Sequence, residues 1–160
     1  MRKERKKRNQ QGMTLIELVV VILIMGILSA ASVAGIGYVN SMNATSAAEK
    51  VASLLNRTRV LSISAEGSVT LVLSQNGNSY YGKIMRGGTE EESVKLGTTN
   101  LDIKVLEGAT LKPLDSVTCS ISFKKENGAF DSCPYSAIVV EGTKTKTVRM
   151  VQNTGRCYVE

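Results

Sequence analysis

The hydrophobic pattern changes twice along the chain. Residues 2–11 are polar and cationic, whereas residues 18–48 carry no charge and residues 18–39 are overwhelmingly apolar. An apolar helix of about 20 residues is long enough to cross a bilayer core. The Lys and Arg residues before the apolar run predict that the N-terminus lies inside and the following chain outside the membrane. We therefore expect a single membrane span at about residues 18–39.

After the apolar run, the pattern becomes that of an amphipathic helix. Small and apolar residues recur at spacings of three and four, and the charged residues among them lie off this stripe. The stripe consists of Ala47, Val51, Leu54, Leu55, Thr58 and Leu61. Because no Pro precedes Pro113, one helix is predicted at residues 14–65, with Gly67 as a suitable stop.

From Ser68 onward, the sequence shows the alternation and tight turns of β-strands. Strands are predicted at residues 69–73, 80–85, 117–123, 137–140, 147–151 and 156–159, with turns at Asn76-Gly77, Asn127-Gly128 and Asn153-Thr154-Gly155. Residues 86–99, rich in Gly, Thr and Glu, are predicted to form an exposed connection. The pattern predicts an α+β protein in which the amphipathic half of the helix packs on an antiparallel β-sheet head.

The net charge of +6 comes from an uneven distribution of basic residues. Residues 1–12 hold six of the 20 Lys and Arg and one of the 14 Asp and Glu. Without them, fourteen basic and thirteen acidic residues remain, a net charge of +1. The basicity therefore indicates a topology signal rather than a surface for an anionic ligand.

The residue inventory argues against catalysis. The chain has no His, which excludes His-based acid–base chemistry and His-containing metal sites. No nucleophile elbow, P-loop or pair of carboxylates stands out, and Glu90, Glu91 and Glu92 are typical of a solvated loop. We expect no enzymatic activity, no metal and no cofactor.

The three cysteines, Cys119, Cys133 and Cys157, lie 14 and 24 residues apart, which matches no close metal or redox spacing. In an exported head, one disulfide could join two of them, and the sequence leaves the pairing open. Cys119 alternates with Val117 and Ile121, so it also fits the role of a small core residue.

Residues 12–18, between the basic leader and the apolar helix, read GMTLIEL. This stretch resembles the prepilin cleavage and methylation motif of type IV pilins and type II secretion pseudopilins. The resemblance implies that a prepilin peptidase and methyltransferase cleaves after Gly12 and N-methylates Met13. It also implies a type IV pilin-like fold with a cleaved leader at residues 1–12, a helix at residues 13–66 and an extracytoplasmic β-rich head at residues 67–160.

Glu17 lies at the edge of the apolar run, where an ionised carboxylate is unfavourable in a bilayer unless a cation pairs with it. By the resemblance, Glu17 is the family's characteristic Glu, which meets the N-terminal amine of a neighbouring subunit as the apolar helices bundle. The implied function is that of a structural subunit in a pilus or pseudopilus. Its partners would be other subunits, the peptidase and the lipid membrane.

Two simpler hypotheses compete with this interpretation. Residues 1–34 could form an ordinary secretory signal peptide, cleaved after Ala34, or the apolar run could anchor a β-domain in the membrane. Neither alternative requires Gly12 or Glu17. Against the first, the apolar run is longer than a usual signal-peptide core, and the amphipathic helix continues directly from it.

Beyond the motif, two regions resemble the H-type minor pseudopilins and related minor pilins. They are the helix end with the first strand, residues 54–73, and the later hairpins that contain Asn127-Gly128 and Thr154-Gly155-Arg156. One departure is Ala34, where the family often has Pro. Gly35 and Gly37 follow, and either local helix flexibility or close helix packing in the membrane would explain them.

DNA capture is a second functional hypothesis, because some minor pilins of this subfamily serve in DNA uptake. The candidate contacts are Lys144, Lys146 and Arg149, with Lys124 and Lys125 on a neighbouring hairpin. Lys144 and Lys146 alternate with Thr, a pattern that equally fits the solvent face of an edge strand.

Overall fold

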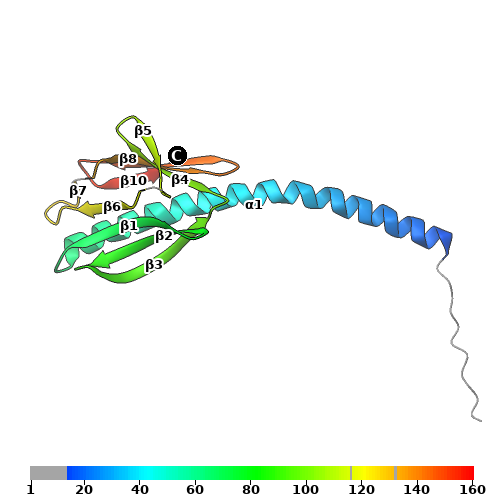
Figure 1. Cartoon of the computed structure of the whole chain (residues 1–160), viewed down its shortest axis with the longest axis horizontal. Coiled ribbons are helices and arrows are strands. Elements are labelled where there is room, and N and C mark those ends of the chain that lie inside the picture. Colours follow the sequence, from blue (N-terminus) through cyan, green and yellow to red (C-terminus); the bar gives the residue numbers. More distant parts are fainter. Residues whose placement is uncertain (1–13, 116, 132) are drawn as a thin grey trace, which may run out of the picture. The chain divides into compact units, whose positions relative to one another are not determined.

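The structure is a computed structural model that describes residues 14–115, 117–131 and 133–160. For residues 30–42 it describes the backbone alone. The described chain forms one helix, α1 (Leu15–Ser64), followed by strands β1 to β10 (Figure 1). It divides into two compact units, residues 1–36 and residues 37–160. The predicted helix at residues 14–65 and the α+β class are therefore confirmed.

In the first unit, the described residues belong almost entirely to the N-terminal part of α1. Among the residues that the structure describes, no helix combines the length and apolar character needed to cross a membrane. The predicted span at residues 18–39 includes residues 30–39, whose side chains lie outside the description. The predicted leader at residues 1–12 also lies outside the described residues.

The described residues of the second unit form two five-stranded antiparallel sheets, whereas a single sheet was predicted. The first sheet has the order β3-β2-β1-β6-β7 and the second the order β10-β9-β8-β4-β5. The strands of the first sheet are β1 (Val69–Asn76), β2 (Ser79–Arg86), β3 (Thr89–Thr98), β6 (Cys119–Phe123) and β7 (Phe130–Asp131). Those of the second sheet are β4 (Asp102–Glu107), β5 (Thr110–Pro113), β8 (Tyr135–Glu141), β9 (Thr145–Val151) and β10 (Arg156–Val159).

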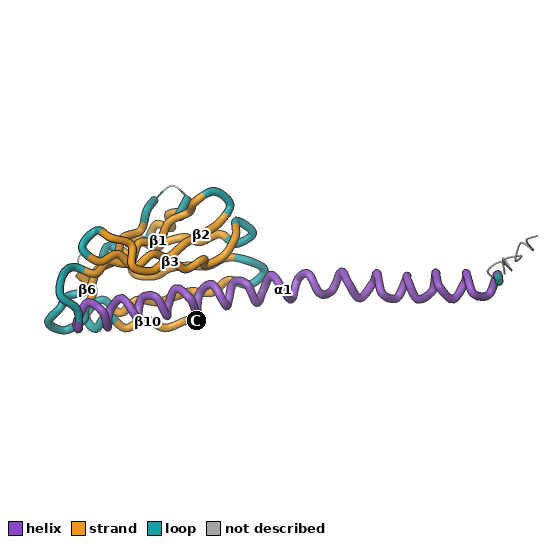
Figure 2. Tube along the Cα trace, turned by 90° about the horizontal axis from the view of Figure 1, so that it is seen from below, coloured by secondary structure: helices purple, strands orange, loops and turns teal. Residues whose placement is uncertain are grey.

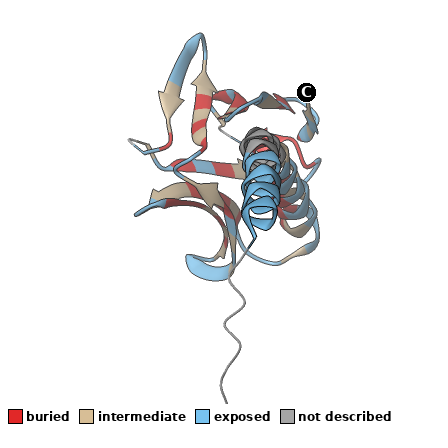
Figure 3. Ribbon diagram, turned by 90° about the vertical axis from the view of Figure 1, so that its right-hand side faces the viewer, coloured by how far each residue is buried: buried red, intermediate tan, exposed pale blue. Residues whose placement is uncertain are grey.

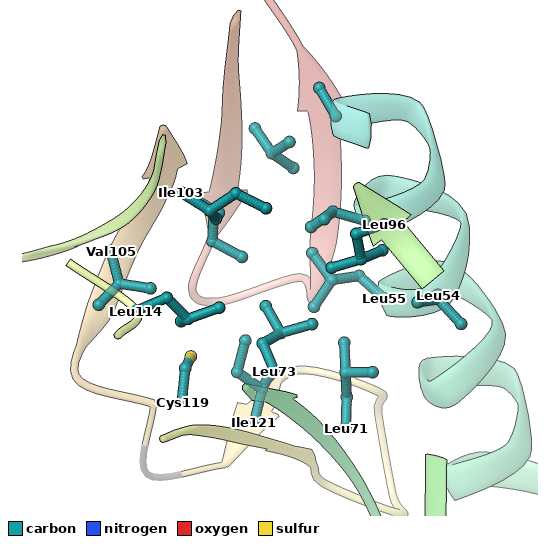
Figure 4. Close-up of a cluster of buried hydrophobic side chains, with 14 of the residues drawn as sticks. Leu54, Leu55, Leu71, Leu73, Leu96, Ile103, Val105, Leu114, Cys119 and Ile121 are labelled. Carbon is teal, nitrogen blue, oxygen red and sulfur yellow. The ribbon is translucent and has the colours of Figure 1, made fainter. Parts of the chain in front are cut away.

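The predicted amphipathic stripe faces the core of the second unit. Five of its six residues are buried and Leu61 is half-buried; the buried ones are Ala47, Val51, Leu54, Leu55 and Thr58. In Figure 2, this part of α1 runs alongside the strands. Figure 4 shows Leu55 extending from α1 toward Leu73 of the first sheet, on the side where Ile103 of the second sheet also lies. The C-terminal part of the helix thus completes a core between two sheets.

Buried and exposed residues alternate along several strands, as expected for sheets with one solvated face. Buried positions alternate regularly with intermediate or exposed ones in β1 and β6, and β4 buries Ile103 and Val105 in the same way. Figure 3 shows buried stretches alternating with less buried ones along strands of the second unit. The hairpin around Asn76-Gly77 joins β1 to β2 with the register Asn76↔Ser79. This alternation is what made most of the strands predictable.

The prediction for residues 86–99 is wrong, because most of this segment forms strand β3. Its glutamates are not those of a solvated loop: Glu90 pairs with Lys83 at 2.6 Å, and Glu91 pairs with Arg86 at 3.1 Å. Glu92 pairs with Arg57 of α1 at 3.1 Å. These cations come from the neighbouring strand and the helix, so the charges are compatible with an edge strand.

Two turns pack against each other at the C-terminal end of α1. The φ angles of Gly128 and Gly155 are 66° and 64°. The guanidinium Nε of Arg59 donates a hydrogen bond to the Gly128 carbonyl oxygen at 2.9 Å. A Cβ atom on Gly155 would lie 1.8 Å from that same oxygen, so only Gly fits there. This contact joins the helix to the two predicted turns.

Candidate assembly segment

Thr14 and Glu17 form the start of α1. The backbone N–H of Glu17 donates to Oγ1 of Thr14 at 3.4 Å, and the N–H of Leu18 donates to the Thr14 carbonyl oxygen at 3.2 Å. Thr14 therefore acts as the N-cap, and Glu17 occupies the third helical position, the arrangement of a capping-box sequence. The T-x-x-E spacing was visible in the sequence, but its capping role was not predicted.

Glu17 lies in the first turn of α1, where a carboxylate interacts favourably with the helix dipole. The residue is exposed, and its carboxylate forms no ion pair with any residue that the structure describes. Its charge therefore has no counter-charge among the residues that the structure describes.

The helix that follows is apolar on every side. Within the described part of the first unit, twelve large apolar side chains are exposed, from 37% for Val21 to 81% for Leu15. Such a contiguous apolar surface is unfavourable in water and marks a membrane or protein contact. Because the residues surround the helix rather than form a stripe, one flat partner surface would not cover them.

The two residues of the predicted cleavage site, Gly12 and Met13, lie outside the described residues. In the described residues, Thr14 caps a helix that begins at Leu15 and is apolar in its N-terminal part. The chain then continues into a β-rich unit.

Comparison with known families finds a match in the N-terminal part of the chain. The model of the Prokaryotic N-terminal methylation motif matches residues 7–33, a stretch that contains Gly12, Met13 and Glu17. This match supports the resemblance to type IV pilin-like proteins in the N-terminal part of the chain. Neither the comparison with curated proteins nor the comparison with solved structures finds a match.

The three cysteines differ in burial, and all three are free thiols in this structure. Cys119 is fully buried in the core, as its alternation suggested, and burial, followed by the charge of Cys133, raises its pKa to about 12. Burial also raises the pKa of the Cys133 and Cys157 thiols. The Cys157 sulfur lies 3.5 Å from the Ala52 carbonyl oxygen of α1. A disulfide among these residues stays a prediction.

The candidate DNA contacts are not gathered on one face. Lys144 lies in the turn before β9, while Lys146 and Arg149 lie three positions apart in β9 and therefore point to opposite sides of the sheet. Arg149 also pairs with Glu160 at 2.8 Å, and this contact raises its pKa. DNA capture stays a prediction without a shared cationic surface to support it.

Proposed function

We propose that this chain is a structural subunit of a type IV pilus or type II secretion pseudopilus. A prepilin peptidase cleaves it after Gly12 and methylates Met13, and the apolar helix then assembles with those of other subunits. The observation that carries this proposal is the match of the methylation motif to residues 7–33. The exposed apolar side chains around the helix that begins at Leu15 support it.

Glu17 supplies the chemistry of assembly. After cleavage, Met13 carries a cationic amine, and a neighbouring subunit can offer this amine to the carboxylate of Glu17. Both charges are costly in apolar surroundings, and pairing them removes much of that cost. The exposed carboxylate in the first turn of α1 is suited to such a contact. The pair would set the axial register between adjacent helices.

The proposed topology follows from the same segment. Before assembly, the chain crosses the bacterial cell membrane once, at about residues 18–39, with its N-terminus in the cytoplasm and the β-rich head outside. The leader carries six Lys and Arg residues, whose charges would hinder extraction of the helix from the membrane. Cleavage removes these charges before assembly. The subunit has no catalytic role in this scheme.

Within the family, we propose a minor subunit related to the H-type minor pseudopilins. The support is the passage from the end of α1 through Gly67, at φ 94°, into β1, together with the closing hairpin of β9 and β10. A minor subunit would decorate the filament or help to cap its tip through its head.

A substitution at Glu17 tests the assembly step. In cells that express the full chain with a prepilin peptidase and a filament assembly system, we expect Glu17→Gln to leave cleavage after Gly12 intact. Its amount in the sheared filament fraction should fall by about tenfold or more, because the partner amine is left without a counter-charge. The matched control is Glu49→Gln, on the exposed surface of α1 in the head. Equal incorporation of both variants would refute the role of Glu17.

A further inference from the structure

A cavity of about 300 Å³ lies in the second unit between α1 and the end of strand β3. Its size is at the lower end of the range for small-molecule sites. The side formed by α1 consists of Asn43, Ser46 and Lys50, which share one face of the helix because they are three and four residues apart. The other side consists of residues 95–98, Asn100 and Leu101. We call this cavity the α1–β3 groove.

Two polar contacts join the helix to β3 along this face. Lys50 Nζ donates a hydrogen bond to the Lys95 carbonyl oxygen at 3.3 Å. About two helical turns later, Arg57 Nη1 donates to Glu92 Oε1 at 3.2 Å. The acceptors follow each other in the opposite direction along β3, so the helix and the strand lie beside each other over this stretch. The shape of the α1–β3 groove is therefore set by the packing of the second unit.

The polar groups of the groove favour a negatively charged ligand. Its lining includes two lysines, two asparagines and two residues with hydroxyl groups, and none of the lining residues carries a carboxylate. Lys50 and Lys95 form no ion pair with any residue that the structure describes. An ammonium group has three donors, and the Lys95 carbonyl oxygen accepts from one of those of Lys50. Glu49 is adjacent to Lys50 in the sequence, but it does not line the groove.

The position of the groove along the chain indicates the source of such a ligand. Asn43 follows residue 39, the end of the predicted span, by four positions in the same helix, about 6 Å along the helix axis. The polar headgroup region of a bilayer extends about 5–8 Å beyond the hydrocarbon core on each side. Lys50 lies farther along, but its side chain leaves the helix toward the N-terminus, and thus toward the span. The groove therefore begins at the depth of the lipid phosphates.

We propose that the α1–β3 groove binds the phosphate group of an anionic membrane lipid, with Lys50 as the main cation. The inference rests on the proposed function, because it requires the membrane span at residues 18–39. Lys50 and Lys95 attract the phosphate by charge, and Asn43 donates a hydrogen bond to its oxygens. A zwitterionic lipid carries the same phosphate next to a cation that the lysines repel, so the groove selects an anionic headgroup. The contact holds the head at the membrane until the subunit enters a filament.

The test measures lipid binding by the full chain in a non-ionic detergent. Dioctanoyl phosphatidylglycerol and dioctanoyl phosphatidylcholine are titrated separately, and native mass spectrometry counts the bound lipids. We expect phosphatidylglycerol to bind about tenfold more tightly than phosphatidylcholine, and Lys50→Gln to weaken its binding about fivefold or more. The matched control is Lys125→Gln, which removes an exposed lysine outside the groove and should leave both affinities unchanged. The basic leader is the same in every variant, so the differences between variants report the groove.

A second variant separates binding from folding. Lys95→Gln keeps the carbonyl oxygen that accepts from Lys50, so we expect an unchanged thermal midpoint and weaker binding of phosphatidylglycerol. The proposal is overturned if the two lipids bind equally, or if both lysine variants bind phosphatidylglycerol like wild type. Competition by inorganic phosphate at the same concentration as the lipid would identify a soluble anion as the ligand and would also overturn it. Cleavage after Gly12 without lysine-dependent lipid binding would refute the lipid site and leave the proposed function intact.

Discussion

The two parts of α1 differ in how their apolar side chains are arranged and in how far these side chains are exposed. In the C-terminal part, apolar residues form one stripe, and two sheets of the same chain bury it, as for Leu55 at 0% exposure. In the N-terminal part, apolar residues surround the helix, and Leu23 remains 60% exposed. Folding of the chain removes the first apolar surface from water. Removing the second apolar surface from water requires molecules outside the chain. The helix is thus part of a folded core at one end and carries an exposed apolar surface at the other.

The largest expected effect distinguishes these two environments. Leu55→Ala should lower the free energy of unfolding by about 2–5 kcal/mol, because it removes a buried side chain between two sheets. Leu23→Ala, the same change in the exposed segment, should leave the stability of the head unchanged. Thermal unfolding of the full chain in detergent, followed by the β-sheet signal in circular dichroism, measures both. Similar losses in the two variants would show that the contrast is wrong.

The next effect concerns the contact that ends the buried part of the helix. Gly155→Ala should cost about 2–3 kcal/mol, because the new Cβ meets the Gly128 carbonyl oxygen and the backbone is left-handed. Gly77→Ala is the matched control, since Gly77 has a φ of 57° but open space around it. It should cost only the backbone strain, about 1 kcal/mol. Equal losses in the two variants would exclude the turn-to-turn contact.

A smaller effect tests whether water is excluded from the core around Cys119. The Cys119 pKa is raised from 9.0 to about 12 in the folded chain, so the folded state holds this proton more tightly. Its contribution to stability is therefore fully present below pH 9 and is lost as the pH rises toward 12. At pH 10.5 the loss should be on the order of 1–2 kcal/mol.

The comparison that isolates this effect uses Cys119→Ala. Raised pKa values of Tyr80 and Tyr135 add to the pH dependence of both proteins, so only the difference between them reports Cys119. Chemical unfolding at pH 8 and pH 10.5 should show a larger loss of stability for wild type than for the variant. Parallel loss in both would mean that water reaches the thiol.

Local patterns made much of the fold predictable. The stripe that includes Val51 and Leu55 predicted the buried helix face, and Asn76-Gly77 predicted the first hairpin, because both depend on residues close in sequence. The division into two sheets was not predictable in the same way. It depends on pairing between β4 and β8, which lie about 30 residues apart.

The error at Glu90, Glu91 and Glu92 has the same origin. Three adjacent acids suggest a solvated loop, and the cations that make them suitable for a strand lie elsewhere, with Arg57 on the helix. The assembly segment was easier, since Glu17 stands out against an uncharged background. The α1–β3 groove could not be found from the sequence, because it forms only when distant segments meet.

The most direct test of the proposed pilin role is the mass of the N-terminal peptide. The full chain is expressed with and without a prepilin peptidase, and the membrane fraction is analysed by intact-mass and peptide mass spectrometry. We predict that the peptidase yields a chain that begins at Met13 and carries one added methyl group. A chain that begins near Gly35, with or without the peptidase, would contradict the account and indicate an ordinary secreted β-domain.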